Sequence, residues 1–360
     1  MRIDRLSLKN FRNYEDETLS FTDGTNLICG KNGMGKTNAL EAIYYFSQGR
    51  GLRGNSREAI RSGCENAAVS LAFSSKDRDF EGYIRFDGKQ KKILLNDIEL
   101  KKTSQLIGNF SCVLFTPDEM NLVKGSPDVR RRFMDSSIIP LRPAYLSLLI
   151  RYNLILKQKS SLLRTSDIRY ADYSMLPVFN QQLAEVGAKI ISVRRSYIER
   201  IKGPAKEAQL EISSGAENLE ISYSSGVHSE GNIEEIKEAF MKKLTEMEDS
   251  EKENKICFVG PHRDDLVFKI NGKNARSFAS QGQQRSIVIC MKSAQMELLK
   301  DETGEYPVLL LDDIMSELDR ERRDFLTGKI EGKQVIITCT DIDEGRNYEN
   351  IIRIENGRVI

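Results

Sequence analysis

A short glycine-rich segment near the N-terminus restricts the fold more than any other part of the chain. Residues 30–37 read Gly-Lys-Asn-Gly-Met-Gly-Lys-Thr and match the G-x-x-x-x-G-K-[ST] phosphate-binding loop at every fixed position. The apolar residues 27–29 predict a buried strand before this loop, and residues 38–45 have the apolar spacing of a helix after it. A chance match within a glycine-rich turn is the alternative, which the flanking strand and helix disfavour.

Each residue type in this loop has a chemical role in holding a nucleotide. The curled backbone points successive N–H groups at phosphate oxygens, and the helix N-terminus adds a partial positive charge. Lys36 is expected to reach the β- and γ-phosphates, and the Thr37 hydroxyl to ligate Mg²⁺. The predicted phosphate-binding residues are Gly30, Lys31, Asn32, Gly33, Met34, Gly35, Lys36 and Thr37.

A second motif supplies carboxylates late in the chain. Residues 308–313 read Val-Leu-Leu-Leu-Asp-Asp, which is typical of a buried parallel strand that ends at the ligand-binding edge of a sheet. We expect Asp312 to hold Mg²⁺, and Asp313 to orient or deprotonate the attacking water. A strand that merely ends in two solvated aspartates is the alternative.

Composition excludes several other classes of protein. Among 360 residues there are only two histidines, so neither a zinc cluster nor a histidine-based triad is supported. The six cysteines are scattered without a C-x-x-C pair, which favours reduced thiols. No window approaches the length of a membrane span and no signal core is present, so we expect a cytoplasmic protein without a membrane role. The net charge of +1 neither supports nor excludes nucleic-acid binding.

The pattern along the chain predicts an α/β protein with two lobes. Strand patterns dominate before residue 118: two over residues 3–21, then 67–73, 80–86 and 92–95. Helical patterns follow over residues 129–137, 143–164, 176–202 and 233–248, the longest of them about 22 to 27 residues, or roughly 35 to 40 Å. Strands are expected again at 255–259 and 266–270, while residues 210–229 are either short strands or loop. We therefore expect an ATPase lobe formed by residues 1–117 and 300–360, and a mainly helical lobe formed by residues 118–299.

The spacing of the two motifs distinguishes between classes of phosphate-loop protein. Small GTPases and nucleoside kinases bring their metal-binding carboxylate soon after the loop, whereas here a helical insert intervenes. Residues 280–283, the signature segment, read Ser-Gln-Gly-Gln and resemble the Ser-Gly-Gly-Gln signature of ABC ATPases, with Gln281 at the first glycine position. Such a segment offers a hydroxyl, a glycine N–H and a helix N-terminus to a γ-phosphate. It is followed, in the ABC order, by the acidic strand and by Ser-x-Leu-Asp at residues 316–319.

Taken together, the motifs resemble the RecF family of the SMC and ABC-type ATPases. The residues that carry this resemblance span nearly the whole chain, in family order: 9–14, 30–37, 116–118, 123–127, 130–133, 260–265, 280–285, 310–313 and 316–319. The resemblance implies an ABC-ATPase-like head, with a phosphate-loop mixed sheet and an antiparallel β part, plus a helical second lobe with short arms. Its implied nucleotide site adds Arg12, Ser280, Gly282 and Gln283 to the loop.

The resemblance also implies a function in DNA repair, replication and recombination, including the SOS response. The implied protein binds ATP and Mg²⁺, hydrolyses ATP weakly with stimulation by DNA, and dimerises on ATP. It binds gapped DNA at single-strand–double-strand junctions, and supports RecA loading with RecR and RecO. Because one chain has one loop and one signature segment, a two-fold homodimer would complete both sites.

Departures from the wider ABC pattern limit what the resemblance carries over. Thr340 occupies the usual switch-histidine position, Asp313 replaces the usual catalytic glutamate, and residues 116–119 contain no Q-loop glutamine. Slow hydrolysis is the expected consequence. The helical arms are too short for an SMC-type coiled coil. An SMC-like head, a transporter-type ATPase subunit and an ATPase acting on DNA ends are the alternatives.

Basic residues of the helical lobe are candidates for DNA contacts. Phosphate contacts would come from Arg130, Arg131 and Arg132, and from further residues of the same lobe. The further candidates are Lys157, Lys159, Arg164, Arg194 and Arg195. The alternative for each is ordinary solvated charge.

Overall fold

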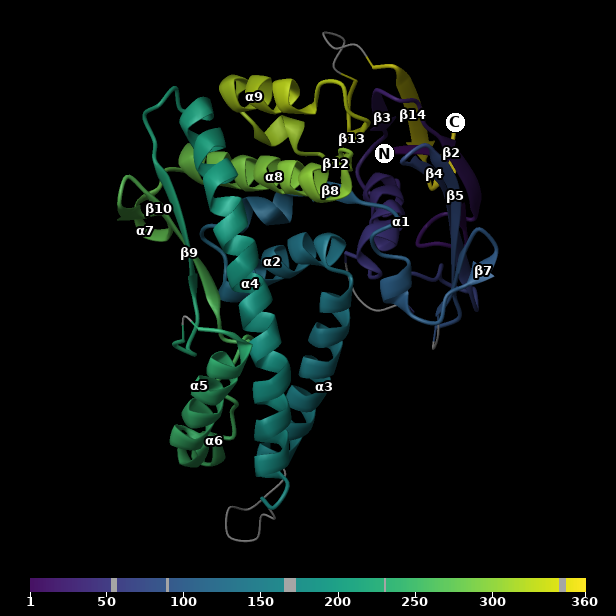
Figure 1. The fold of residues 1–360 in the computed structure, drawn as a ribbon. Helices are drawn as coiled ribbons and strands as arrows, with labels where there is room; N and C mark the ends of the chain where they lie inside the picture. Colours follow the sequence, from purple (N-terminus) through teal and green to yellow (C-terminus); the bar gives the residue numbers. More distant parts are fainter. Residues whose placement is uncertain (53–56, 89–90, 165–172, 230, 343–347) are drawn as a thin grey trace.

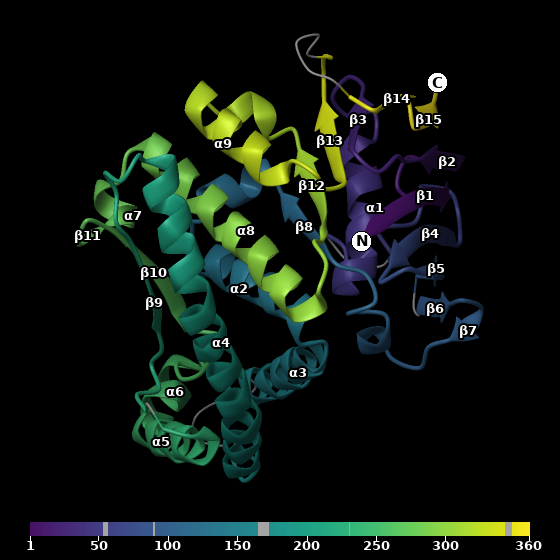
Figure 2. The ribbon, with the colours of Figure 1, turned by 45° about the horizontal axis from the view of Figure 1, so that its top comes forward.

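The protein has an α/β fold that combines a mixed sheet, an antiparallel sheet and a helical region (Figure 1). The computed structural model describes residues 1–52, 57–88, 91–164, 173–229, 231–342 and 348–360. Figure 2 shows the two six-stranded sheets on one side of the molecule. On the other side lie the helices α3 (Ala144–Arg164), α4 (Leu176–Ile212), α5 (Ile233–Glu246) and α6 (Glu248–Asn254). This arrangement agrees with the fold class that the sequence predicts.

The mixed sheet holds both nucleotide motifs. Its strand order is β15-β14-β3-β13-β12-β8, and every pair is parallel except β14 with β15. The strands are β3 (Thr25–Cys29), β8 (Cys112–Phe115), β12 (Val308–Asp312), β13 (Val335–Cys339), β14 (Asn350–Glu355) and β15 (Arg358–Val359). Only β13 separates β3 from β12, so the segments that follow these two parallel strands meet at one edge of the sheet.

Helices cover both faces of this sheet, which explains why its central strands are apolar throughout. On one face, Leu310 and Ile336 pack with α1 (Lys36–Gln48). On the other face, Leu309 and Ile337 pack with two helices of the C-terminal half. These are α8 (Gln281–Thr303) and α9 (Arg320–Ile330).

An antiparallel sheet packs against the outer side of α1. Its order is β2-β1-β4-β5-β6-β7, and burial along β4 alternates strictly, so one face is in the core and the other is towards solvent. Phe11 and Phe86 contact the ring of Tyr45 on α1. The strands are β1 (Arg2–Lys9), β2 (Asp16–Ser20), β4 (Ala67–Ser75), β5 (Arg78–Phe86), β6 (Lys91–Leu95) and β7 (Ile98–Glu99).

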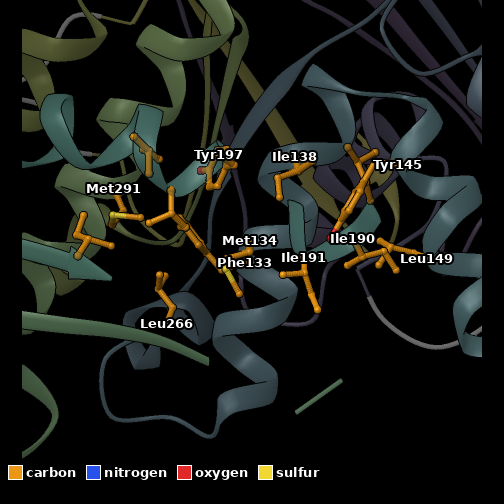
Figure 3. Packing of buried hydrophobic residues seen from close by; sticks show 14 of the residues in the cluster. Phe133, Met134, Ile138, Tyr145, Leu149, Ile190, Ile191, Tyr197, Leu266 and Met291 are labelled. Carbon is orange, nitrogen blue, oxygen red and sulfur yellow. The ribbon is translucent and has the colours of Figure 1, made fainter. Parts of the chain in front are cut away.

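The helical region has its own hydrophobic core. Figure 3 shows Phe133 and Met134 of α2 among Ile190 and Ile191 of α4, with Met291 of α8 in the same cluster. The helices are α2 (Pro127–Leu141), α3 (Ala144–Arg164), α4 (Leu176–Ile212), α5 (Ile233–Glu246), α6 (Glu248–Asn254) and α7 (Ala275–Phe278). A small antiparallel sheet of β9 (Leu219–Ser224), β10 (Asp265–Ile270) and β11 (Lys273–Asn274) joins them.

Helix α4 is longer than the sequence predicts. It has 37 residues, or about 55 Å, whereas the expected helix ended at residue 202, before Gly203 and Pro204. Pro204 lies inside the helix, and Ala205 and Ala208 beyond it are buried, so packing outweighs the helix-breaking tendency of this pair. Among the described helices, α4 included, none combines the length and the apolarity needed to cross a membrane.

The strand expected at residues 255–259 is wrong. Lys255 ends α6 with a left-handed backbone, and the next residues bond to side chains instead of a neighbouring strand. The Phe258 N–H donates to Glu251 Oε1 at 2.7 Å, and the Cys257 carbonyl accepts from Arg263 Nε at 3.0 Å. These bonds satisfy the backbone without a sheet.

Helix α8 contributes residues to two hydrophobic cores. Its Val288 and Met291 belong to the helical core, while Ile289 and Met296 belong to the core beneath the mixed sheet. Because one helix belongs to both cores, the lobe boundaries expected between residues 117 and 118 and between residues 299 and 300 stay a prediction.

Candidate nucleotide-binding site

The predicted phosphate loop connects β3 to α1 in a conformation that only glycine adopts readily. Gly33 and Gly35 have φ angles of 80° and 119°. A Cβ on Gly35 would also lie 2.7 Å from Asn13 Nδ2, closer than any side chain tolerates. Among the described residues, no side chain caps α1, and the first turn of the helix has no acidic residue. The helix N-terminus is therefore available for an anion.

Lys36 lies across this loop. Its ammonium donates to the carbonyl oxygens of Gly30 at 2.6 Å and Lys31 at 3.1 Å, and the residue is only 6% exposed. A nearly buried cation enclosed by a backbone loop is a suitable partner for the phosphate chain of a nucleotide. These contacts show that the loop residues fit the nucleotide expected from the sequence.

Two residues for which the sequence predicted no role bind carbonyl groups of the loop. Asn13 Nδ2 donates to the Met34 carbonyl at 2.8 Å, and the Tyr14 hydroxyl donates to the Gly35 carbonyl at 2.9 Å. Burial raises the pKa of Tyr14, so its hydroxyl keeps the proton that it donates. Both residues belong to the block 9–14 that carries the family resemblance, which was the available signal.

The expected metal ligands are in contact with each other. Thr37 Oγ1 donates to Asp312, at 2.8 Å from Oδ1 and 3.0 Å from Oδ2. The described residues hold no cluster of three or more His, Cys, Asp or Glu side chains suited to a metal. A hydroxyl and one carboxylate fit Mg²⁺ in a nucleotide site, where phosphates and waters complete the oxygen shell.

Thr338 on β13 is a further residue of this site that the sequence did not reveal. It is 1% exposed, and its Oγ1 donates to Asp312 Oδ1 at 2.8 Å while accepting the Asp313 N–H at 2.9 Å. One hydroxyl therefore fixes both residues of the acidic pair. No sequence motif points to it, because the contact depends on the pairing of β12 with β13.

Asp313 has the environment of a proton acceptor. Its partial burial raises the pKa of its carboxyl, nearby Lys36 lowers it, and Asp312 raises it again. Its backbone is left-handed, with φ of 51°, and it lines the same cavity as Lys36 and Thr37. A carboxylate with a raised pKa in this position can accept a proton from a water beside the phosphates.

A cavity of about 920 Å³ extends from the loop towards α2. Its wall includes Asp312, Asp313, the short helix η2 (Pro117–Asn121) and Arg132. Residues 116–119, where no Q-loop glutamine was found, therefore border the site. Thr116 and Glu119 cap each other across η2, and Glu119 also pairs with Lys292 at 2.7 Å.

The three consecutive arginines do not share one environment, because successive helical residues point about 100° apart. Arg130 is 2% exposed and forms two bonds with Asp265, at 2.6 and 2.8 Å. Arg131 pairs with Asp128 and donates to the Asp264 carbonyl at 2.7 Å. Burial thus corrects the expectation that Arg130 contacts DNA, and of the three only Arg132 is exposed.

Two other DNA candidates are also structural. Lys159 is fully buried and pairs with Glu251 at 2.5 Å. Arg194 is 3% exposed, pairs with Asp135 at 2.9 Å and donates to the Pro261 carbonyl at 2.7 Å. Such buried pairs hold helices together and leave no cation for a DNA phosphate.

Arg12 is engaged with α1. Its guanidinium forms two bonds with Glu41, at 2.8 and 3.0 Å, and donates to the Glu58 carbonyl at 2.8 Å. These contacts fix the segment before the loop. A direct contact between Arg12 and the nucleotide stays a prediction.

The signature segment lies away from the phosphate loop of its own chain. Ser280 caps α8 by accepting the Gln283 N–H at 3.2 Å, and Gln283 Nε2 donates to Glu217 at 2.9 Å. Figures 1 and 2 show α8 beginning beside α7, on the side of the molecule opposite α1. In the part of the chain that the structure describes, the wall of the cavity includes no residue from 280–283.

Comparison with known proteins gives matches along the whole chain. The family model described as RecF/RecN/SMC N terminal domain matches residues 2–358. The DNA replication and repair protein RecF of Acetivibrio thermocellus is 39% identical, with 99% of each chain covered. The protein of the same name from Clostridium acetobutylicum is 40% identical, with 100% of this chain and 99% of the relative covered.

Solved structures also match along nearly the whole chain. A structure described as the recombination mediator protein RecF-ATPrS in the RecFOR pathway superposes with a TM-score of 0.92 at 35% identity, covering 99% of this chain and 97% of the other. Its counterpart described as RecF-ATP has a TM-score of 0.90, also at 35% identity, covering 100% and 97%. The Smc head of Pyrococcus furiosus, with a TM-score of 0.56 at 17% identity over 100% and 96%, shares the fold alone.

Proposed function

Because this chain belongs to the RecF family, we propose that it is an ATP-dependent recombination mediator, which dimerises on ATP and binds DNA at gaps and single-strand–double-strand junctions. Slow ATP hydrolysis, stimulated by DNA, resets the protein. With RecR and RecO it supports RecA loading. The pathway named for the similar RecF-ATPrS structure supports this assignment.

One observation carries the proposal: among the described residues, the signature segment does not line the cavity around the phosphate loop. Lys36, Thr37 and Asp312 line the cavity, while Ser280 caps the N-terminus of α8 and is not part of the described wall. A signature segment can contact a γ-phosphate only if a second copy supplies it. Two chains around a two-fold axis supply it twice, since such a contact is self-complementary.

ATP then acts as the link between the copies. The loop N–H groups and Lys36 bind the phosphates of one chain's nucleotide, and Ser280 and Gly282 of the second chain face its γ-phosphate. ADP lacks that phosphate and favours separate chains. Each nucleotide therefore contacts both copies, and hydrolysis weakens the dimer.

The residues at the cavity divide the work of hydrolysis. Bound Mg²⁺, held by Thr37 and Asp312, would neutralise charge on the phosphates. Asp313 orients the attacking water and accepts its proton, which its raised pKa favours. A threonine, Thr340, stands where ABC ATPases have their switch histidine, so no imidazole assists and turnover is slow.

DNA binding is proposed for the dimer, with Arg132 as one contact. The test is fluorescence anisotropy with gapped and continuous duplexes at one fixed salt concentration, with ATP, ADP or no nucleotide. The expected result is tighter binding of gapped DNA with ATP, and loss of this ATP effect in Lys36→Ala. If the gapped and continuous duplexes bound with equal affinity, and ATP changed neither affinity, the proposal would be contradicted and another ABC-type head favoured.

A further inference from the structure

The signature segment is attached to the helix that follows the acidic strand. Arg322 of α9 donates from Nε to the Gly282 carbonyl at 2.9 Å and to Ser286 Oγ at 2.9 Å. Its side chain is 18% exposed, and Ser286 is buried. The first turn of α8 is therefore held by one guanidinium from α9.

The guanidinium lies close against Gly282. A Cβ on Gly282 would lie 2.9 Å from Arg322 Nη2 and 3.2 Å from Cζ. Gly282 is not among the residues with a positive φ, so its backbone conformation would accept other residues. A larger residue at this position would displace the Arg322 guanidinium from its present place.

A second contact joins α8 to the segment just before α9. Arg285 pairs with Glu317 at 3.1 Å, and Glu317 belongs to the short helix η3 (Met315–Glu317) just after Asp313. Ser316 Oγ donates to the Asp313 carbonyl at 2.9 Å. Asp319 caps α9 through the Arg322 N–H and also pairs with the Arg322 guanidinium. Residues 316–319 thus connect the acidic pair of one chain to its own signature segment.

We propose that Arg322 is a positioning residue, which orients the signature segment for a nucleotide held by a second copy of this chain. The proposal rests on the proposed function, in which the two copies share each site. Ser280 and the N–H groups of the first turn of α8 have to keep one direction to meet a γ-phosphate. Arg322 fixes this turn through the Gly282 carbonyl, and it is not part of the described wall of the cavity in its own chain.

Substitution separates this role from nucleotide binding. Arg322→Ala is expected to leave the ATP affinity of the single chain unchanged, and to lower ATP-driven dimerisation and turnover about tenfold. Arg322→Lys should recover part of this loss, because an ammonium keeps the charge but not the fork of donors. Arg320→Ala is the matched control, since Arg320 lies on the same helix and its side chain is 94% exposed. Equal loss of ATP affinity and dimerisation in Arg322→Ala would indicate a merely structural residue and overturn the proposal.

A mixing experiment shows which copy Arg322 serves. In a mixed dimer of Lys36→Ala and Arg322→Ala chains, the Arg322→Ala chain has an intact loop and receives an intact signature segment from its partner. Turnover should rise above that of either variant alone, to at most about a quarter of the wild-type rate, because random pairing would make half of the dimers mixed and each of these has one intact site. If Arg322 acted on its own chain's nucleotide, no site in the mixture would be intact, and the absence of recovery would overturn the proposal.

A reference mixture tests the proposed function separately. Lys36→Ala mixed with Ser280→Arg should recover to the same extent, since it too leaves one intact site in each mixed dimer. No recovery in this mixture would overturn the shared site itself. Recovery here, without recovery in the Arg322→Ala mixture, would overturn only the role of Arg322.

Discussion

Replacing Thr338 by valine tests how the acidic pair is held. The change keeps the volume of the side chain but removes the hydroxyl that donates to Asp312 at 2.8 Å and accepts the Asp313 N–H at 2.9 Å. A hydrogen bond to a charged group contributes about 1.5–3 kcal/mol, and an unpaired buried N–H costs about 1–3 kcal/mol. Taking the low end of each, we expect Thr338→Val to lower the free energy of unfolding by about 2.5 kcal/mol.

Thr338→Ser separates the hydroxyl from the methyl group. It keeps both hydrogen bonds and should lose only about 1 kcal/mol for the missing methyl. Thr18→Val is the control, because Thr18 is an exposed strand residue whose hydroxyl forms a hydrogen bond with Ser7 Oγ at 3.1 Å. It should change stability little. Urea unfolding of the four proteins without nucleotide measures these differences.

The same variants should differ in their use of Mg²⁺. A residue that orients a metal ligand typically changes metal affinity by about tenfold or more. We therefore expect Thr338→Val, but not Thr338→Ser, to need about tenfold more Mg²⁺ for tight binding of a fluorescent ATP analogue. If Thr338→Val unfolded like the wild type and needed no more Mg²⁺, the account of how Asp312 is held would be refuted.

Three further predictions concern the site, DNA and pH. Asp312→Asn should weaken Mg²⁺-dependent nucleotide binding. Asp313→Asn should keep ATP bound and prolong the ATP-dependent dimer, because only the proton acceptor is lost. Identical nucleotide binding by the two variants would refute these roles. Arg132→Ala should reduce the slope of log affinity for gapped DNA against log salt by about one, and the exposed Arg320→Ala should not; an unchanged slope with Arg132→Ala would place the DNA surface elsewhere. Burial lowers the pKa of His262 to about 4, so the folded protein binds fewer protons than the unfolded chain below about pH 6.5, and stability is lost as pH falls. Between about pH 7.5 and pH 5, this loss in the free energy of unfolding should reach about 2 kcal/mol in the wild type and be absent in His262→Gln. Equal losses in the wild type and in His262→Gln, measured by urea unfolding, would contradict the prediction.

Features encoded over a few neighbouring residues could be predicted from the sequence. Residues 30–37 and 308–313 fix their own local structure, because the glycines set the loop and the apolar run sets the strand. Their meeting at one sheet edge follows from the rule for parallel strands, and the Thr37–Asp312 contact confirms that they meet.

Features that depend on distant partners could not be predicted. The sequence has three consecutive arginines, but only the fold shows that Arg130 is buried and paired with Asp265. Thr338 is one β-branched residue among several in β13 until its pairing with β12 is known. The helix predicted to end at residue 202 continues through Pro204, because buried residues beyond it keep α4 continuous.

Molar mass measured by light scattering tests the shared site most directly. Chromatography of the wild-type protein with a slowly hydrolysed ATP analogue and Mg²⁺ should give twice the mass found with ADP or without nucleotide. Ser280→Arg should remain a single chain under all three conditions while still binding the analogue. A wild-type protein that stays a single chain with the analogue, or a dimer of equal stability without nucleotide, would contradict the claim that ATP joins two copies through the signature segment.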